Sequence, residues 1–352
     1  MRHFGVSFLV SALCLVVAGW WGFQRAGWSG MLAAFWITLI LGVLEVSLSF
    51  DNAVVNASVL RSWNRLWQTL FLTIGILVAV FGMRLLFPLL IVSQATGLGI
   101  VEVWRMAIAT PNEYSRHLTN HYAEVAAFGG MFLLLVFLNF VLDRDKEVHW
   151  IGWLEEKLAI LGRIDSVAVL VALLTLLATL NLVPEAKLLP VLLAGLWGIV
   201  IYVAVKVISG FLAQEEDSSG VGEAIKRGGI GGFLYLEVLD ASFSFDGVIG
   251  AFAITKDVVI IMLGLGIGAM FVRSTTIYLV RKGTLDEYVF LEHGAHYAIG
   301  VLAAIMLVSV KVHIPELITG LVGVAFIVAA LWSSIRHKRM QALKAEMVET
   351  SD

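Results

Sequence analysis

Residues 44–57 read LEVSLSFDNAVVNA and place two acidic residues, Glu45 and Asp51, inside a long apolar run. Residues 239–252 read LDASFSFDGVIGAF and carry Asp240 and Asp246 at the same spacing of six positions. Ionised carboxylates are costly inside an apolar segment, so a motif that carries two of them and occurs twice is not ordinary packing. These two stretches predict an internal repeat built around buried acids.

The chain around these stretches is too apolar for a water-soluble domain of 352 residues. It is 59% hydrophobic and 14% charged, with a mean hydropathy of +0.91, whereas soluble chains carry about 25% charged residues. Runs of about 20 apolar residues suit membrane-spanning helices. The sequence predicts an all-α polytopic membrane protein of about ten transmembrane helices, near 4–23, 31–60, 66–94, 121–142, 165–183, 187–211, 230–255, 257–281, 291–311 and 314–335. The first run has no small-residue cleavage site after it, so we expect a retained helix.

Charge and cysteine content exclude several classes of partner and site. The 24 basic and 27 acidic residues give a net charge of -3, which offers no basic surplus for nucleic acid. The single cysteine, Cys14, excludes an intramolecular disulfide and a cysteine-built zinc site.

The distribution of basic residues predicts the orientation in the membrane. With ten spans, fifteen Lys and Arg residues fall on the side of the N-terminus and six on the other side. The positive-inside rule then predicts that both termini are cytoplasmic, in a plasma (inner) membrane. We expect a first repeat core at 1–142, a cytoplasmic interfacial linker at 143–164, further helices at 165–335 with the second repeat core at 230–335, and a cytoplasmic tail at 336–352.

Two further matches between the halves follow the acidic motifs in the same order. A deep arginine comes first, as GMRLLF around Arg84 and FVRSTT around Arg273. NEYSRHLTNHYA from Asn112 and DEYVFLEHGAHYA from Asp286 come next. With five spans in each half, an odd number, the second half enters the membrane from the side opposite to the first half. Inverted repeats of about five helices are typical of secondary transporters, which bind their substrate near the midplane.

The expected spans concentrate their acids on the two matched helices. Each ionised carboxylate near the bilayer centre costs about 2.5 to 3.5 kcal/mol. Neutralisation by Arg84 and Arg273 in a structural charge network is one interpretation. Two arginines leave up to three negative charges uncompensated, and a bound cation or protons would supply the balance. The five acids are Glu45, Asp51, Glu237, Asp240 and Asp246.

The six-residue spacing constrains how each pair of acids could share one ion. Six residues turn about 600° along a helix, so the two carboxylates point about 120° apart. We therefore expect a helix break near 47–52 and another near 242–247. Oxygen ligands without thiolates favour a hard or borderline divalent cation, Mn²⁺, Mg²⁺ or Ca²⁺. The predicted ligands are Glu45, Asp51, Asn52, Asp240 and Asp246.

Neighbouring polar side chains have two interpretations each. Ser49 and Ser244 could support the site, or their hydroxyls could bond back to their own helices, as could those of Ser47 and Ser242. We expect Asn56 to form an interhelical hydrogen bond rather than to ligate an ion.

Two histidine clusters are predicted at opposite sides of the membrane. They could be entry and exit vestibules that relay protons or release metal as the pH falls. Ordinary hydrogen bonding to neighbours is the alternative. The clusters comprise His117, His121 and Glu124 before the fourth span, and His293 and His296 at the ninth.

At these motifs the sequence resembles the TerC family of integral membrane proteins, within the cation-exporter superfamily that also contains LysE-type transporters. EVSLSFDN at 45–52 and DASFSFDGVIGAFAIT at 240–255 are similar to that family's two acidic motifs, and the glycine-rich approaches to the two arginines are similar too. The resemblance covers 31–142 and 230–335. The family usually has Ser and Pro after the second aspartate, where this chain has Gly247 and Val248, and Glu237 is an added acid.

The resemblance implies export of a divalent metal, chiefly manganese, with the five predicted ligands as the transferred positions. We expect a transporter rather than an enzyme, with proton exchange as one candidate driving force, Glu237 assisting or carrying a proton, and the two arginines holding the carboxylates. The expected partners are the metal ion, as substrate, and the lipid bilayer. No prosthetic group is expected, and a homodimer is left open. The alternatives are an assembly or insertion factor and a membrane-embedded acid or metal hydrolase.

Overall fold

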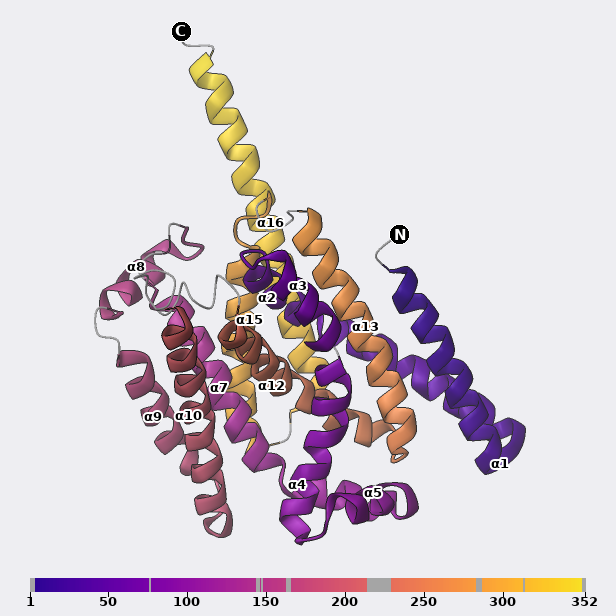
Figure 1. Cartoon of the computed structure of the whole chain (residues 1–352). Coiled ribbons are helices and arrows are strands. Elements are labelled where there is room, and N and C mark those ends of the chain that lie inside the picture. Colours follow the sequence, from indigo (N-terminus) through magenta and orange to yellow (C-terminus); the bar gives the residue numbers. More distant parts are fainter. Residues whose placement is uncertain are drawn as a thin grey trace.

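The structure, a computed structural model, describes residues 4–349 apart from 76, 144–145, 147, 163–165, 214–228, 283–286 and 313. Every regular element within these described residues is a helix, as Figure 1 shows. Seven helices are long and apolar enough to cross a membrane. The prediction of an all-α integral membrane protein is therefore confirmed at this level.

The helices of the first half are α1 (Gly5–Leu48), α2 (Phe50–Leu60), α3 (Arg65–Leu70), η1 (Phe71–Gly75), η2 (Val78–Leu86), α4 (Phe87–Thr96), α5 (Ile100–Ala109), α6 (Pro111–Asn120) and α7 (Tyr122–Val141). They are followed by α8 (Gly152–Leu161), α9 (Val167–Leu180), η3 (Glu185–Lys187), α10 (Leu188–Ala213), α12 (Ile230–Ile254), α13 (Val258–Lys282), α15 (Leu291–Ser309) and α16 (Glu316–Glu349). Among them η1 and η2 are π-helical.

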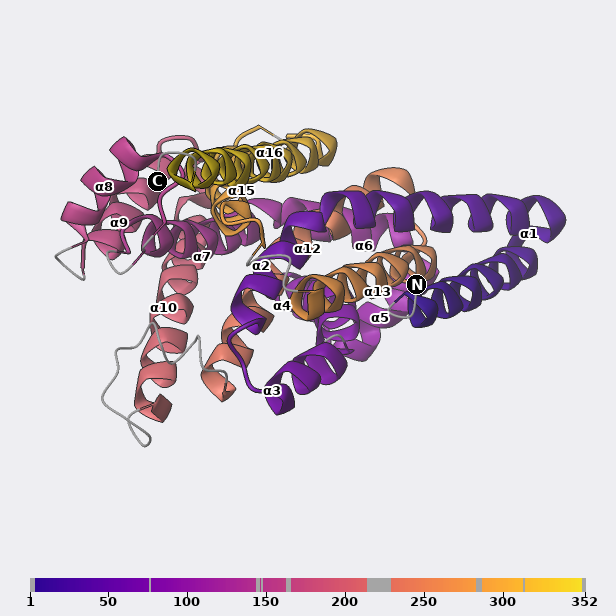
Figure 2. The ribbon, with the colours of Figure 1, turned by 90° about the horizontal axis from the view of Figure 1, so that it is seen from above.

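The seven candidate spans do not confirm the expected ten. The first two expected spans are joined in α1, whose backbone turns back at Ala26 and Gly27, where Gly27 has φ 63°. Glycine adopts this left-handed conformation without the steric cost of a Cβ atom. The two arms then lie side by side (Figure 2), so closely that a methyl group at Gly22 would collide with the Gly30 carbonyl. Two further expected spans are not among the seven: α9 has 14 residues, and α12 carries three acids.

The centre of the molecule is an antiparallel pair, α7 and α15, with α2 and α12 packed against it. At one end of the pair Phe140 stacks on His296, with ring centroids 3.8 Å apart. Toward the other end Gly129 lies beside Met306. Large side chains from all four helices fill the core between them, including Leu60, Phe132, Leu239 and Met306. This core fixes the position of α2 and α12, which carry the motif acids.

The N-terminus, α8 and the C-terminal end of α16 lie toward the same side of the molecule, the upper side in Figure 1. The short helices α5 and α6, which the hydropathy pattern did not predict as spans, lie at the opposite side. Within the expected linker at 143–164 lies the short helix α8, and α16 continues through the expected tail region to Glu349.

A buried glutamate ties the linker to α15. The Glu155 side chain is 0% exposed and forms an ion pair with Lys146 at 3.0 Å. Its carboxylate accepts hydrogen bonds from the Tyr297 hydroxyl at 3.0 Å and from the Ile151 amide at 3.2 Å. Burial raises the pKa of Glu155. The opposite effect of the hydrogen bonds from Lys146 and Ile151 and of the Lys146 charge is larger, so the pKa lies below its ordinary value of 4.5.

We predict that this contact makes stability fall in acid. A carboxyl group whose pKa is lower in the folded state stabilises it fully above its unfolded pKa, near 4.5, and loses that contribution as the pH falls through the folded value. Replacing Glu155 with Gln leaves Lys146 buried without its partner and should cost about 3 to 5 kcal/mol at neutral pH. Thermal unfolding of detergent-purified protein from pH 7 to about 3 measures both effects.

The matched control is Glu156→Gln, because Glu156 is the exposed neighbour on the same helix. Equal stability of the two variants at neutral pH would contradict the assigned role of Glu155.

Candidate functional site

The first acidic motif lies across a helix break. Helix α1 ends at Leu48, Ser49 has non-helical backbone angles (φ -102°, ψ 19°), and α2 begins at Phe50. This confirms the predicted break within 47–52. It places Glu45 in the last turn of α1 and Asp51 in the first turn of α2, where the helix dipole favours a negative charge.

Glu45 is paired with an arginine inside the molecule. The carboxylate is 4% exposed and contacts Arg84 at 2.5 Å, and Ser49 donates a second hydrogen bond at 3.1 Å. Glycines of two other helices make room for the side chain, since a methyl group at Gly247 or Gly268 would collide with it. One of the two predicted arginines therefore does hold a motif carboxylate.

Asp51 faces a small polar cavity of about 50 Å³. Its carboxylate accepts a hydrogen bond from the Asn52 amide at 3.0 Å and approaches the backbone of α16 at Gly323. A cavity needs roughly 10 to 15 Å³ of such volume to hold one water. This cavity has space for water, or for a cation with part of its hydration shell. The lining residues include Glu45, Ser49, Asp51, Asn52, Thr319 and Gly323.

Asp240 lies beside a second small cavity, of about 40 Å³. Its carboxylate accepts a hydrogen bond from the Asn56 side chain at 2.9 Å, which confirms the predicted interhelical role of Asn56. Arg84 and Arg273 also line this cavity. The Nε of Arg273 donates to the carbonyl of Leu72 at 2.6 Å, so this arginine binds the backbone of π-helical η1.

The predicted break near 242–247 is wrong. Helix α12 continues from Ile230 to Ile254, and Ser242 donates to the carbonyl of Val238 within it. The physical reason is that Asp240 obtains its donor from α2, through Asn56, so α12 need not unwind to satisfy it. The backbone of Asp246 lies in α12, but its side chain is outside what the structure describes.

The two cavities share Ser49 and Asn52 as a common wall. The predicted ligands therefore occupy two adjoining compartments, one with Glu45 and Asp51 and the other with Asp240. Among the described side chains, no three His, Cys, Asp or Glu residues gather closely enough to hold one ion. Ser244 lines the cavity of Asp240, whereas Ser47 bonds back to its own helix, as Ser242 does.

The histidine clusters lie at opposite ends of α7. His121 is partly exposed and lies 3.4 Å from Glu124, with His117 partly buried one turn earlier. His293 and His296 are buried, at 4% and 7% exposure. His293 contacts the Val148 carbonyl at 2.9 Å. Its ring neighbour Phe140 stacks on His296 in the contact between α7 and α15.

Sequence reasoning missed the contribution of α16. Thr319, Gly320 and Gly323 line the cavity of Asp51 and form part of its wall. Their only sequence signal is three small residues on neighbouring turns of an apolar helix, which is equally typical of ordinary helix packing in membranes.

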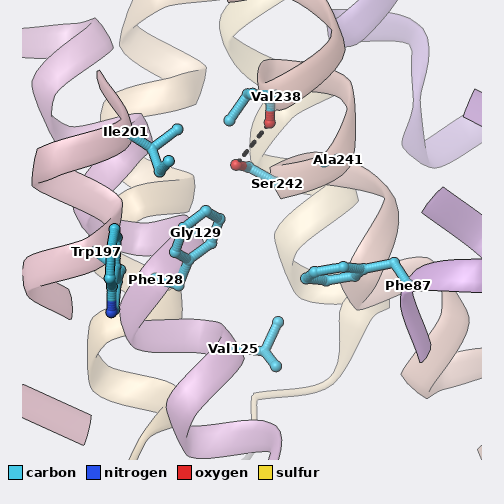
Figure 3. A pocket seen from close by; sticks show the side chains of 9 residues that line it. All are labelled: Phe87, Val125, Phe128, Gly129, Trp197, Ile201, Val238, Ala241 and Ser242. Atoms are coloured by element: carbon cyan, nitrogen blue, oxygen red, sulfur yellow. Dashed lines mark hydrogen bonds between the residues drawn. The ribbon is translucent and has the colours of Figure 1, made fainter. Parts of the chain in front are cut away.

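A larger cavity lies apart from these carboxylates. Its volume is about 360 Å³, and it lies between α7, α10 and α12, with Phe87 closing one side (Figure 3). The one hydroxyl in its lining, that of Ser242, is hydrogen-bonded to the Val238 carbonyl. Such a lining suits an apolar group and offers an ion no ligand.

A protein-family model described as "protein of unknown function (DUF475)" matches residues 50–341. The chain belongs to the DUF475 family. No curated protein and no solved structure shows significant similarity. The family match includes Asp51, Asn52, Arg84 and the whole of α12, and it begins five residues after Glu45.

We predict that Glu45 and Arg84 depend on each other for stability. Replacing Arg84 with Gln should cost about 3 to 5 kcal/mol, because it leaves a buried carboxylate without its partner. The double variant Glu45→Gln/Arg84→Gln should recover most of that loss. Denaturant unfolding of the single and double variants measures the coupling.

Arg65→Gln, at an exposed arginine, is the control for loss of positive charge. Strictly additive losses from Glu45→Gln and Arg84→Gln would show that the pair does not act as a unit.

Proposed function

We propose that the chain exports a divalent cation, with Mn²⁺ as the expected substrate, from the cytoplasm across the plasma membrane. The observation that carries this proposal is the cavity of Asp51. It combines carboxylate, amide and hydroxyl oxygens at a helix break, inside a membrane protein, with space for a partly hydrated ion. Hard divalent cations prefer such oxygen ligands.

The charges of the Asp51 compartment support a bound cation. Asp51 and Glu45 line it, and Arg84 pairs with Glu45, so Asp51 leaves the compartment with a negative surplus. Asn52 and Ser49 border both compartments and could pass an ion between Asp51 and Asp240. We propose Glu45, Asp51, Asn52, Asp240 and Asp246 as the ligands used along this path.

The directions of matched helices support a ten-helix architecture with inverted repeats. Glu45 lies beside Gly247 and Asn56 binds Asp240, so the first motif helix pair and α12 run in opposite directions. Leu72 contacts Arg273 and Val80 contacts Gly266, so the segment that contains η1 and η2 is antiparallel to α13. Helices α7 and α15 are antiparallel as well. All three motif-matched pairs are antiparallel, as the two halves of an inverted repeat require.

The proposed orientation has both termini in the cytoplasm. The N-terminus, α8 and the C-terminal end of α16 share one side of the molecule, and the segments predicted to lie on that side contain fifteen Lys and Arg residues against six on the other. Proton exchange is the proposed driving force, since a cation that enters among buried carboxylates favours the release of a proton from a nearby acid and so couples the two fluxes.

We predict that Asp51→Asn abolishes Mn²⁺ transport by folded protein. Proteoliposomes loaded with a metal-sensitive dye report the uptake of Mn²⁺, Ca²⁺, Mg²⁺ and Zn²⁺, and the wild type should favour Mn²⁺. Loss of one charged ligand should weaken binding more than about tenfold, which corresponds to about 1.4 kcal/mol. Glu185→Gln, an exposed carboxyl, is the matched control. Undiminished uptake by Asp51→Asn would overturn the assigned site.

A second prediction tests the wall that α16 provides. A methyl group at Gly323 would lie 3.0 Å from the Asp51 carboxylate, so Gly323→Ala should displace it and weaken Mn²⁺ binding. Gly266→Ala is the control, because its methyl group would meet its nearest neighbour at 3.9 Å. Mn²⁺-dependent thermal stabilisation measures binding in both variants.

The Glu45 and Arg84 pair favours one other function, an assembly or insertion factor with a structural charge network. That function predicts normal folding with no Mn²⁺-dependent stabilisation and no metal uptake in the same two assays.

A further inference from the structure

Glu237 differs from the other described acids of the motif helices. The side chain is 5% exposed, and neither carboxyl oxygen has a hydrogen-bond partner among the residues that the structure describes. Glu45, Asp51 and Asp240 each accept a hydrogen bond from a side chain or an amide. A buried carboxylate without a donor costs several kcal/mol, and the neutral acid avoids most of that cost.

The carboxyl group of Glu237 is packed against a glycine at the end of a π-helical segment. A methyl group at Gly75, the last residue of η1, would come within 2.5 Å of the Glu237 Oε1. A side chain at this position would therefore displace the acid. Short π-helical segments occur frequently at functional sites.

The equivalent crossing in the first half contains no acid. The two acidic motifs are offset by 195 positions, so the position in the first half that matches Glu237 is Gly42. The two arginines are offset by 189 positions, so Gly75 matches Gly264 in the second half. A methyl group at Gly42 would lie 3.5 Å from the Gly264 carbonyl, so these two matched positions also lie together. Since glycine is sufficient for this crossing, Glu237 is not needed to pack it.

The charged groups around Glu237 leave it uncompensated. Asp240, one turn further along α12, adds a second negative charge. On the helices packed against α12, Arg84 of η2 pairs with Glu45 and Arg273 of α13 binds the Leu72 carbonyl. Lys206 of α10 donates to the Asn139 side chain.

We infer that Glu237 is a proton-binding site, separate from the cation ligands, that carries the exchanged proton. This inference rests on the proposed cation export and specifies its coupling. Glu237 lies about 10 Å along α12 from its first residue, on the proposed cytoplasmic side of Asp240. A proton leaving the Glu237 carboxyl enters water at that side, and one arriving through Asp240 crosses a single helical turn, about 5 to 6 Å between Cβ atoms.

Two measurements test the site independently. Infrared difference spectra of purified wild-type protein in lipid, recorded between acidic and alkaline pH, should contain a protonated-carboxyl C=O band that Glu237→Gln removes and Glu113→Gln, at an exposed acid, retains. In proteoliposomes, an imposed pH gradient should accelerate Mn²⁺ transport by the wild type, and Glu237→Gln should transport Mn²⁺ without that acceleration.

The outcomes separate this inference from the proposed function. A band that persists in Glu237→Gln, or full acceleration of that variant by the gradient, overturns the proton site. Absence of Mn²⁺ transport by the wild type overturns the proposed export, while the band still reports on Glu237. If Glu237→Gln fails to fold, Glu237→Gly replaces it in both measurements, because the matched position in the first half is a glycine, Gly42, against which the Ile267 side chain packs.

Discussion

Pairing of buried carboxylates is the constraint on which the rest of the structure depends. The Glu45 and Arg84 pair joins α1 to η2, and the hydrogen bond from Asn56 to Asp240 joins α2 to α12. Each contact connects helices of different halves or different spans, where an unpaired buried carboxylate would be costly. The apolar core that positions α2 and α12 therefore has to bring each of these donors to its acid.

The sequence predicted much of this arrangement because charges in apolar runs are rare and informative. It predicted the break beside Ser49, the depth of Arg84 and the interhelical role of Asn56. It did not predict that α12 stays continuous, because that depends on a donor from another helix, which no local pattern reveals. It also missed the wall formed by Gly323, since a glycine that admits a carboxylate and one that admits a neighbouring helix look alike in sequence.

The same limit applies at the ends of the helices. Hydropathy located the spans, including the turn between 23 and 31 where α1 folds back at Gly27, but it could not show that Glu155 holds the linker to α15. The burial of His293 and His296 was also not predicted, because it depends on segments far away in the chain. Their place at a helix end suggested access to water, yet Phe140 and the linker segment cover them. Contacts between segments far apart in the chain decide exposure there.

The two halves differ in helix continuity and in their buried acids, and this difference bears on mechanism. The first half contains the broken motif helix and the π-helical segments, whereas α12 and α13 of the second half are continuous. Glu237 has no acidic counterpart, because Gly42 occupies the matched position. A symmetric pair of sites would bind a proton equally from either side. An acid present in only one half gives the proposed exchange a side from which the proton is released.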